Sequence, residues 1–414
     1  MSIRRNRWGI SIIFFLGVMV ILSFGDACGQ SAPKKTVRIG CSLPLNISFG
    51  VEIKRALDLA VDMVNQEGGL TVGKEAYGVE LITYDNKYKP EPAIAATQRL
   101  INIDKVKGLV GDTGAASILA SIPIVQQAGL PMLCSSHSDK TLDPKYKYVY
   151  IMSTARSVDI LYPLLLKARP DIKTAVIAAQ DDETGHDMTR RALLILGQRG
   201  VKVLESFYFP RDMRDYTPVA TKVASLKPDL FPIPGFGGTA EKMGLMSKAL
   251  YDTDWRGATF VTAAPVVKDL ADICPRGEAD GLYIPLADFT LLPDGPPLAV
   301  RMRKAFEQKY GEWREIGPSW TLPFWFWAAA VKKAGGFEAA KIDKALAGLE
   351  VETPIGMAKM IKRPDLNNSR YVDTMVTPAL GQVKGKKVVP VARMTIKDAI
   401  RELEKTYGFN GQWE

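Results

Sequence analysis

Short apolar runs alternate with amphipathic stretches along most of this chain, and this alternation constrains the fold more than any other feature. The clearest instance is residues 108–142, which read as strand, small-residue turn, helix, strand and a second small-residue turn. Leu109 and Val110 end the first strand, apolar residues at helical spacing follow the turn, and Gly129 ends the helix. Repeated strand–helix order implies right-handed crossovers and a largely parallel sheet.

The same order runs through the chain twice. The first run adds strands at 35–42 and 79–85 and helices at 53–65 and 90–102. The second run has strands at 148–152, 174–179, 201–208, 230–233 and 259–262, and helices at 158–168, 187–199, 216–226 and 240–251. A chain of 414 residues exceeds what one core usually serves. We therefore predict an α/β protein of two Rossmann-like lobes, each with its own parallel sheet.

The remaining C-terminal part is too short for a third lobe and is expected to pack back on the other two. It reads as helices at 298–310, 323–334 and 342–349 and strands at 374–379 and 387–392. An aromatic cluster at 320–327 has helical spacing and is interpreted as core, with the option that one ring also lines a cleft.

The first residues have the pattern of a secretory signal peptide. Arg4, Arg5 and Arg7 precede an apolar segment at 10–24, and small residues at 25 and 27 fit a cleavage site. We expect residues 1–27 to be removed and the protein to be exported to the periplasm. An alternative is a lipoprotein site, since Cys28 follows directly.

Charge and cysteine usage exclude several other classes. The net charge is +9, but the basic residues are scattered among many acidic ones and form no basic run that contains aromatics. Nucleic acid is therefore not an expected partner. Cys41, Cys134 and Cys274 are far apart in sequence and form no CxxC pair. They are interpreted as small buried thiols, although Cys41 and Cys134 could be neighbours on one sheet. No metal spacing is present, and no cofactor is expected.

Two loops of residues 108–142 have the composition of a ligand seat. The turns at 111–117 and 134–139 follow neighbouring strands and are rich in free backbone N–H groups and hydroxyls. Ligands of open α/β sheets bind beyond the carboxyl ends of strands, and helix N-termini there attract anions. The sequence therefore predicts a small polar ligand that carries a carboxylate.

Two glycine-rich stretches offer nucleotide-binding alternatives. Residues 68–75 fit GxxxxGK, but Glu75 replaces the Ser or Thr that holds magnesium, and a turn is the better interpretation. Residues 235–240 fit GxGxxA between a strand and a helix, so an enzyme with a dinucleotide site stays a second hypothesis.

The order of these features resembles the periplasmic solute-binding proteins of the branched-chain amino acid transport family, which have the type I two-lobed fold. The resemblance spans residues 35–397. It is carried by IGCSLPLNISFG, ALDLAVDMVNQEGGL, VELITYDNKYKPEPAIAATQRLI, VKGLVGDTGAASILASIPIVQQAGLPMLCSS, DYTPVATKVASLKPDL and FGGTAEKMGLMSKAL. It implies two lobes joined by a hinge, with a cleft between them that holds the ligand.

The resemblance also implies a domain organisation and a role. Lobe 1 is expected at 35–153 with 286–356, lobe 2 at 154–285 with 357–395, and a C-terminal tail at 396–414. The implied role is that of a monomeric, non-enzymatic protein that delivers a small molecule to a membrane ABC permease. A ligand sensor of the same fold, reporting to a signalling partner, is the alternative.

Site residues follow from the resemblance position by position. In relatives an aromatic residue lies over the ligand, loops of lobe 1 bind its carboxylate, and loops of lobe 2 cover it. The corresponding residues here are Phe49, Thr113, Gly114, Ala115, Ser136, His137, Ser138, Thr184, Phe236, Gly237 and Ala264.

One departure from the family pattern bears on the ligand. Amino-acid binders place an acid shortly after the strand at 259–262, whereas this chain has Ala263, Ala264 and Pro265. A buried ammonium without a carboxylate partner is costly. The ligand is therefore expected to be a small organic acid or an amide, unless Asp182 or Glu183 neutralises the ammonium of an amino acid.

Overall fold

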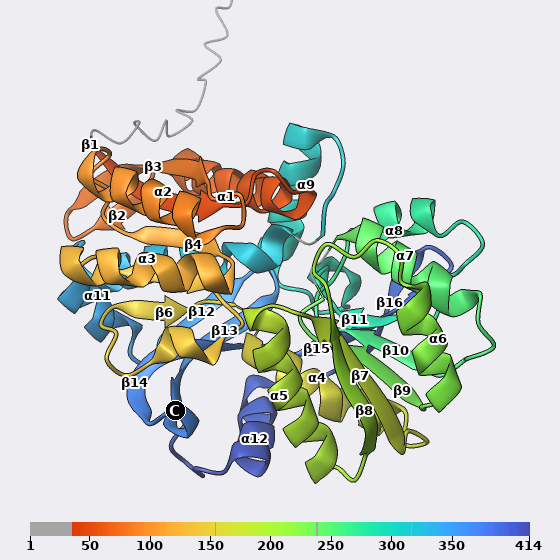
Figure 1. Ribbon diagram of the computed structural model, residues 1–414. Helices are drawn as coiled ribbons and strands as arrows, with labels where there is room; N and C mark the ends of the chain where they lie inside the picture. The colour runs from red at the N-terminus through yellow and green to blue at the C-terminus, as the bar shows by residue number, and fades with distance from the viewer. Residues whose placement is uncertain (1–34, 154, 237–238, 316) are drawn as a thin grey trace, which may run out of the picture. The chain divides into compact units, whose positions relative to one another are not determined.

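The computed structural model describes residues 35–153, 155–236, 239–315 and 317–414 (Figure 1). The expected signal peptide at 1–27, Cys28 and Gly237 lie outside these ranges. Among the described residues, no helix is both long and apolar enough to cross a membrane.

The first lobe is built on a six-stranded sheet in the order β2-β3-β1-β4-β5-β6. All neighbouring strands are parallel except β2, which pairs with β3 in antiparallel fashion. The strands are β1 (Lys35–Leu43), β2 (Leu70–Val72), β3 (Glu75–Asp85), β4 (Leu109–Thr113), β5 (Met132–Ser135) and β6 (Val149–Ile151). The associated helices are α1 (Ser48–Gln66), α2 (Pro90–Asn102), α3 (Ala115–Ala128), α9 (Pro297–Tyr310), α10 (Leu322–Ala334) and α11 (Ala339–Leu346). Trp327 of α10 is fully buried in the same core as the residues of β1. Helices α9, α10 and α11 therefore complete this lobe.

The second lobe is built on a seven-stranded sheet in the order β16-β15-β11-β10-β9-β7-β8. Its strands are β7 (Thr174–Gln180), β8 (Lys202–Phe209), β9 (Leu230–Ile233), β10 (Ala258–Val261), β11 (Tyr283–Pro285), β15 (Ala379–Lys384) and β16 (Lys387–Arg393). Its helices are α4 (Ala155–Ala168), α5 (Glu183–Gln198), α6 (Thr217–Leu226), α7 (Ala240–Tyr251) and α8 (Val267–Ile273). The chain enters or leaves this sheet after β6, after β11 and before β15, so three segments join the lobes.

A small antiparallel sheet lies beside the joining segments. It consists of β12 (Glu350–Thr353), β13 (Gly356–Arg363) and β14 (Asn368–Val376). The C-terminal helix α12 (Ile396–Tyr407) buries one apolar face against β13, β14 and α4, with Trp413 closing that cluster. The expected strand at 374–379 is wrong: it combines the end of β14 with the start of β15.

Two helices start earlier than their sequence patterns predict. The sequence predicts helices from residues 53 and 187, but Phe49 and Gly50 lie in the first turn of α1 and Thr184 lies in the first turn of α5. In both helices a glycine explains the short connection. A Cβ at Gly50 would lie 2.1 Å from the Pro44 carbonyl oxygen, and one at Gly185 would lie 2.0 Å from the Gln180 carbonyl oxygen. Only glycine lets these helices start so close to the strand ends.

The three cysteines of the described chain are free and buried. Cys41 lies on β1 and Cys134 on β5, and β4 separates these strands in the sheet order. The thiols therefore fill core positions.

Candidate functional site

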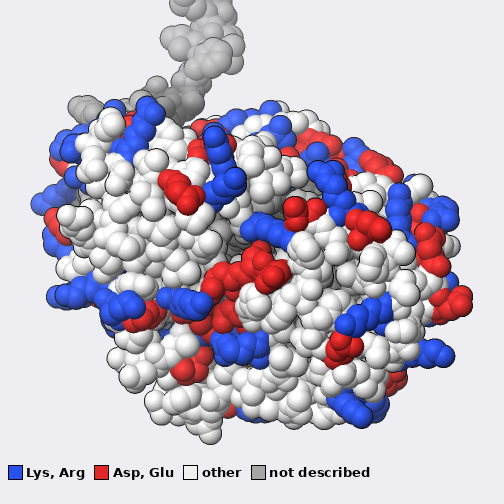
Figure 2. Space-filling view, viewed as in Figure 1, with Lys and Arg blue, Asp and Glu red and all other residues white. Residues whose placement is uncertain are grey.

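A mostly apolar pocket lies where the carboxyl ends of strands from both lobes meet. Pockets of this kind, with an apolar lining and a few polar groups, bind small molecules. Space-filling Figure 2 shows a hollow in the middle of the molecule, with acidic and basic side chains at its edge. Residues from β4, α3 and η3 (Gly317–Thr321) line it from one side, and residues from β7, α5 and the segment after β10 line it from the other.

The N-terminus of α3 supplies free backbone donors to the pocket. Gly114 is the N-cap residue, no side chain caps this end, and the Ile118 N–H is the first to bond back, to the Gly114 carbonyl at 2.9 Å. Thr113, Gly114 and Ala115 all line the cavity. Unpaired N–H groups at a helix N-terminus favour negative charge. This edge of the pocket is suited to a carboxylate.

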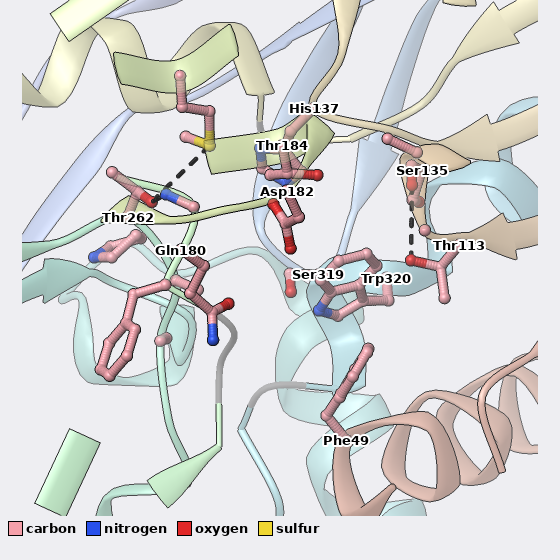
Figure 3. A pocket seen from close by; sticks show the side chains of 18 of the residues that line it. Phe49, Thr113, Ser135, His137, Gln180, Asp182, Thr184, Thr262, Ser319 and Trp320 are labelled. Carbon is pink, nitrogen blue, oxygen red and sulfur yellow. Dashed lines mark hydrogen bonds between the residues drawn. The ribbon is translucent and has the colours of Figure 1, made fainter. Parts of the chain in front are cut away.

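Aromatic rings form one wall of the pocket. The Phe49 ring lies 6.0 Å from the Tyr88 ring, nearly edge-on at 73°, and 6.2 Å from the Trp320 ring. The His137 ring lies 6.4 Å from Trp320 (Figure 3). Trp320 is the cleft-lining member of the aromatic cluster, whereas Phe324 and Trp327 are buried in the core. The sequence gives no signal for Tyr88, because this residue lies in the turn after β3 and outside any periodic pattern.

Lobe 2 contributes the charged residues. Asp182 is the N-cap of α5, where its Oδ1 accepts from the Gly185 N–H at 2.9 Å. Its other oxygen lies 3.3 Å from an Arg211 nitrogen. The Arg211 guanidinium carbon in turn lies 3.8 Å from the centre of the Tyr88 ring. Among the described lining residues, Asp182 and Arg211 are the charged pair, and each already contacts the other.

His137 lies in the pocket wall as a neutral imidazole. Burial lowers its pKa to about 3, and the nearby Arg191 and Arg156 charges act in the same direction. Its Nδ1 atom is buried without a hydrogen-bond partner. His137 therefore offers polarity and a flat surface, not a positive charge.

Three expected residues of lobe 2 border the cavity, but one of them has its side chain in the core. Thr184 and Ala264 line the cavity. Phe236 borders it too, yet its ring is fully buried and packs edge-on against Phe209 and Tyr216, 5.9 and 5.8 Å away. Its side chain therefore belongs chiefly to the core of lobe 2.

Two expected serines do not line the cavity. Ser136 and Ser138 are buried in the turn that leads into η1 (Asp139–Leu142), and Ser135 at the end of β5 takes their place in the wall. The Ser136 hydroxyl accepts from the Ser138 N–H at 3.1 Å. The Ser138 hydroxyl donates to Glu183 Oε1 at 2.9 Å. Because the chain turns at the end of β5, these hydroxyls point into the protein.

Both glycine-rich stretches have packing explanations. Residues 70–72 and 75–85 form the β2–β3 hairpin, so the GxxxxGK match is a turn. The Gly235 N–H donates to Thr262 Oγ1 at 2.9 Å, and a Cβ at Gly235 would lie 3.0 Å from Gly185 Cα. Across the described ranges, no group of three His, Cys, Asp or Glu residues could hold a metal ion.

Comparisons with known proteins agree with this arrangement. A sequence profile of the family described as periplasmic binding protein matches residues 37–377. The Leu/Ile/Val-binding protein homolog 7 of Brucella melitensis is 23% identical over 354 residues, which cover 81% of this chain and 86% of that protein. A leucine-binding protein of Thermotoga maritima has a TM-score of 0.72 at 18% identity, covering 88% of this chain and 100% of its own. An ABC transporter solute-binding protein of R. palustris, solved with 4-hydroxybenzoate, has a TM-score of 0.72 at 17% identity, covering 87% and 96%.

Proposed function

We propose that this chain, which belongs to the periplasmic binding protein family, captures a small aromatic or aliphatic carboxylic acid and presents it to a membrane ABC permease. The fold is the type I arrangement of two lobes, and the pocket is lined from both of them. A ligand that contacts both lobes stabilises the state in which they lie together. That state is the one a permease would recognise.

The acid group is assigned to the N-terminus of α3. Two features converge there: the uncapped N–H groups that follow Gly114 and the positive end of a helix of 14 residues. A carboxylate at this position would accept hydrogen bonds that the protein leaves open.

The body of the ligand is assigned to the aromatic wall. Phe49, Tyr88 and Trp320 surround the space next to the α3 N-terminus, and Met188 and Leu286 add apolar surface. Aromatic rings in offset or edge contact add about 0.5–1.5 kcal/mol beyond the area they bury. This wall supports a ring or a branched apolar chain beside the carboxylate.

The pairing of Asp182 with Arg211 is the observation that carries the choice of ligand. Asp182 is the single acid among the described lining residues. Its Oδ2 atom, which does not cap α5, lies 3.3 Å from an Arg211 nitrogen. An amino acid would have to take this carboxylate from Arg211 to pair its ammonium. An acid without an ammonium leaves the pair intact and avoids burying an unpaired charge.

Matched ligand pairs test the proposal directly. Thermal unfolding of protein refolded to remove bound ligand would be followed with phenylalanine against 3-phenylpropionate, and with leucine against 4-methylpentanoate. A ligand at 100 times its Kd stabilises the protein by about 2.7 kcal/mol. We expect shifts with the deaminated acids alone. Shifts with the amino acids alone would overturn the choice of ligand.

An amino acid is the second candidate, and Asp182 itself is the observation that favours it. Asp182 lies in the wall and can serve an ammonium if Arg211 turns away. Asp182→Asn separates the candidates, because it should abolish amino acid binding but leave binding of the deaminated acids within roughly threefold.

A further inference from the structure

Two neighbouring stripes of side chains run along the first half of α5. Thr184 and Met188, four residues apart, line the ligand pocket. Glu183, Asp187 and Arg190, spaced by four and three residues, form the adjacent stripe. This second stripe does not line the pocket and contacts η1 of the other lobe.

Glu183 uses both of its carboxylate oxygens on the η1 segment. Oε1 accepts from the Ser138 hydroxyl at 2.9 Å, and Oε2 lies 2.8 Å from the Lys140 ammonium. Ser138 is fully buried, whereas the Lys140 side chain is 70% exposed. The Glu183–Ser138 bond is therefore buried from solvent, whereas the Glu183–Lys140 ion pair is exposed to it.

Asp187 and Arg190 extend the contact by one helical turn. Asp187 Oδ2 accepts from the Asp139 N–H at 3.0 Å. Arg190 donates to Asp139 Oδ2 at 2.9 Å and to Asp187 Oδ1 at 2.8 Å. Every residue of the α5 stripe thus bonds to residues 138–140.

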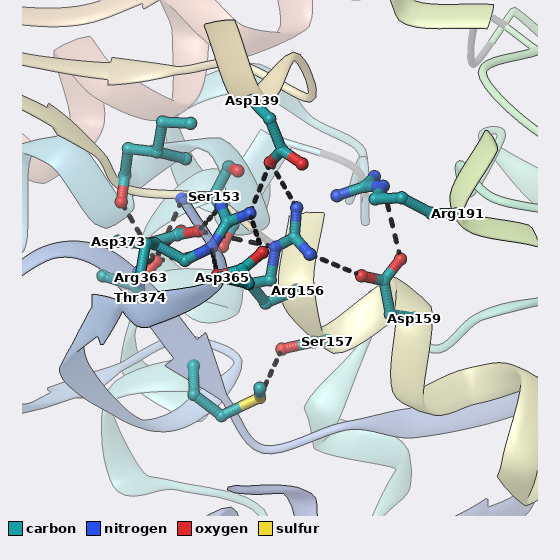
Figure 4. A network of polar contacts seen from close by, with 12 residues as sticks. Asp139, Ser153, Arg156, Ser157, Asp159, Arg191, Arg363, Asp365, Asp373 and Thr374 are labelled. Carbon is teal, nitrogen blue, oxygen red and sulfur yellow. Dashed lines mark hydrogen bonds and ion pairs between the residues drawn. The ribbon is translucent and has the colours of Figure 1, made fainter. Parts of the chain in front are cut away.

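The η1 segment is anchored to the joining segments of the fold, as Figure 4 shows. Asp139 lies at the centre of that network and receives hydrogen bonds from Arg156 at the start of α4 and from Arg363 at the end of β13. Burial alone would raise the pKa of Asp139, but the two guanidinium groups hold it well below its ordinary value. The Asp139 carboxylate stays ionised and keeps its bonds to Arg156 and Arg363. These bonds hold η1 in place where α5 contacts it.

We propose that Ser138, Asp139 and Lys140 with Glu183, Asp187 and Arg190 form an interlobe latch, and that Glu183 is a positioning residue for ligand binding. His137, directly before the latch, and Thr184, directly after Glu183, both line the pocket. A ligand that contacts His137 and Thr184 therefore brings together the same two elements that the latch joins. The inference rests on the proposed binding function.

The latch acts on affinity through the population of the joined state. If only a fraction of the protein has its lobes together, the apparent Kd rises in inverse proportion to that fraction. Latch contacts raise the fraction without touching the ligand. Their loss should weaken binding of every ligand by the same factor, whereas loss of a ligand contact should alter selectivity.

Three variants and one control test the latch. Glu183→Ala removes both contacts, Lys140→Met removes the solvated one, and Ser138→Ala removes the buried one. The control is Glu205→Ala, which breaks the partly exposed Lys222–Glu205 ion pair within lobe 2. Circular dichroism would check that each variant folds.

Small-angle X-ray scattering of ligand-free protein gives the first readout. We expect a larger radius of gyration for Glu183→Ala, Lys140→Met and Ser138→Ala than for wild type and Glu205→Ala. The second readout is the Kd for 3-phenylpropionate and 4-methylpentanoate, which should rise by roughly three- to tenfold for both acids alike. An unchanged radius of gyration in all three latch variants would overturn the latch. If wild type bound neither acid, the choice of ligand would fail while the scattering still decided the latch.

Discussion

The guanidinium of Arg211 stacks on the ring of Tyr88 at 3.8 Å and thereby joins the two lobes at the pocket. Tyr88 lies in the turn between β3 and α2, and Arg211 follows β8. The same guanidinium lies 3.3 Å from Asp182, so one side chain holds both an aromatic ring of lobe 1 and the pocket acid of lobe 2. A planar guanidinium suits this double contact, because it stacks and pairs at the same time.

Removing the Arg211 charge should change which ligands bind. In Arg211→Met, Asp182 loses its partner and becomes an unpaired carboxylate in the wall. We expect binding of 3-phenylpropionate to weaken by about 1–2 kcal/mol, because its negative charge then faces Asp182. Phenylalanine should bind better than to wild type, since its ammonium can pair with Asp182. Isothermal titration calorimetry with both ligands measures the two changes.

Arg214→Met is the control for Arg211→Met. Arg214 is largely exposed and does not line the cavity, although it too pairs with an acid of lobe 2, Glu241. Equal effects of the two substitutions would assign the result to net charge and would contradict a local role for Arg211.

Trp320 should contribute binding energy through its ring. Trp320→Ala removes the partner of both Phe49 and His137 in the wall and opens the cavity. We expect affinity for 3-phenylpropionate to fall by about 1–3 kcal/mol. Trp325→Ala is the matched control, because Trp325 is half-buried on α10 but does not line the cavity. Calorimetry should show weaker binding for the first variant, and wild-type affinity with lower thermal stability for the second.

The fold was predictable because its signals are local and repeated. Each strand–helix unit carries its own periodicity, and glycines such as Gly129 mark helix ends in the left-handed region, with φ of 62°. The early starts of α1 and α5 escaped prediction because they depend on close approaches of Gly50 and Gly185 to the Pro44 and Gln180 carbonyl groups, at or directly after the ends of the preceding strands. Such approaches are set by the geometry of a short connection and leave no periodic pattern in the sequence.

The sequence predicted the pocket-lining residues whose place depends on the backbone alone. It predicted less well the residues whose side-chain direction decides whether they line the pocket. Thr113 ends β4 and Gly114 and Ala115 follow it, and the carboxyl ends of parallel strands meet at one edge of a sheet. Ser138 lies three residues after the end of β5, where its hydroxyl donates to Glu183 of the other lobe and does not face the pocket. Arg211 and Tyr88 lie in connections whose course only the folded chain defines.

Phe236 should act on stability more than on binding. Its ring is fully buried between Phe209 and Tyr216, although it also borders the cavity. Phe236→Ala should lower the free energy of unfolding by about 3–5 kcal/mol, the usual cost of such a core truncation. Urea unfolding measures this loss. A stable variant with weakened ligand binding would instead assign the ring to the pocket wall.

Asp112 should make stability depend on pH. It is buried on β4 beside Thr113, its Oδ2 has no hydrogen-bond partner, and burial raises its pKa to about 7. Since the unfolded-state value is near 3.8, the folded protein keeps a proton that the unfolded chain releases between these values. The contribution of Asp112 to the free energy of unfolding therefore falls as pH rises from about 4 to 7, on the order of 1 kcal/mol per pH unit.

Asp112→Asn removes this titration and leaves a neutral side chain of the same size. Relative to wild type, the variant should be more stable at pH 8, where the buried carboxylate is ionised in the folded protein. Its advantage should shrink as pH falls below about 7 and should be smallest at pH 4, where Asp112 is neutral in the folded protein and about half protonated in the unfolded chain. Urea unfolding of both proteins at pH 4, 6 and 8 gives the difference at each pH, and the other titrating groups cancel in that difference. A difference that stays constant across this range would mean that Asp112 carries the same charge in the folded and unfolded chain.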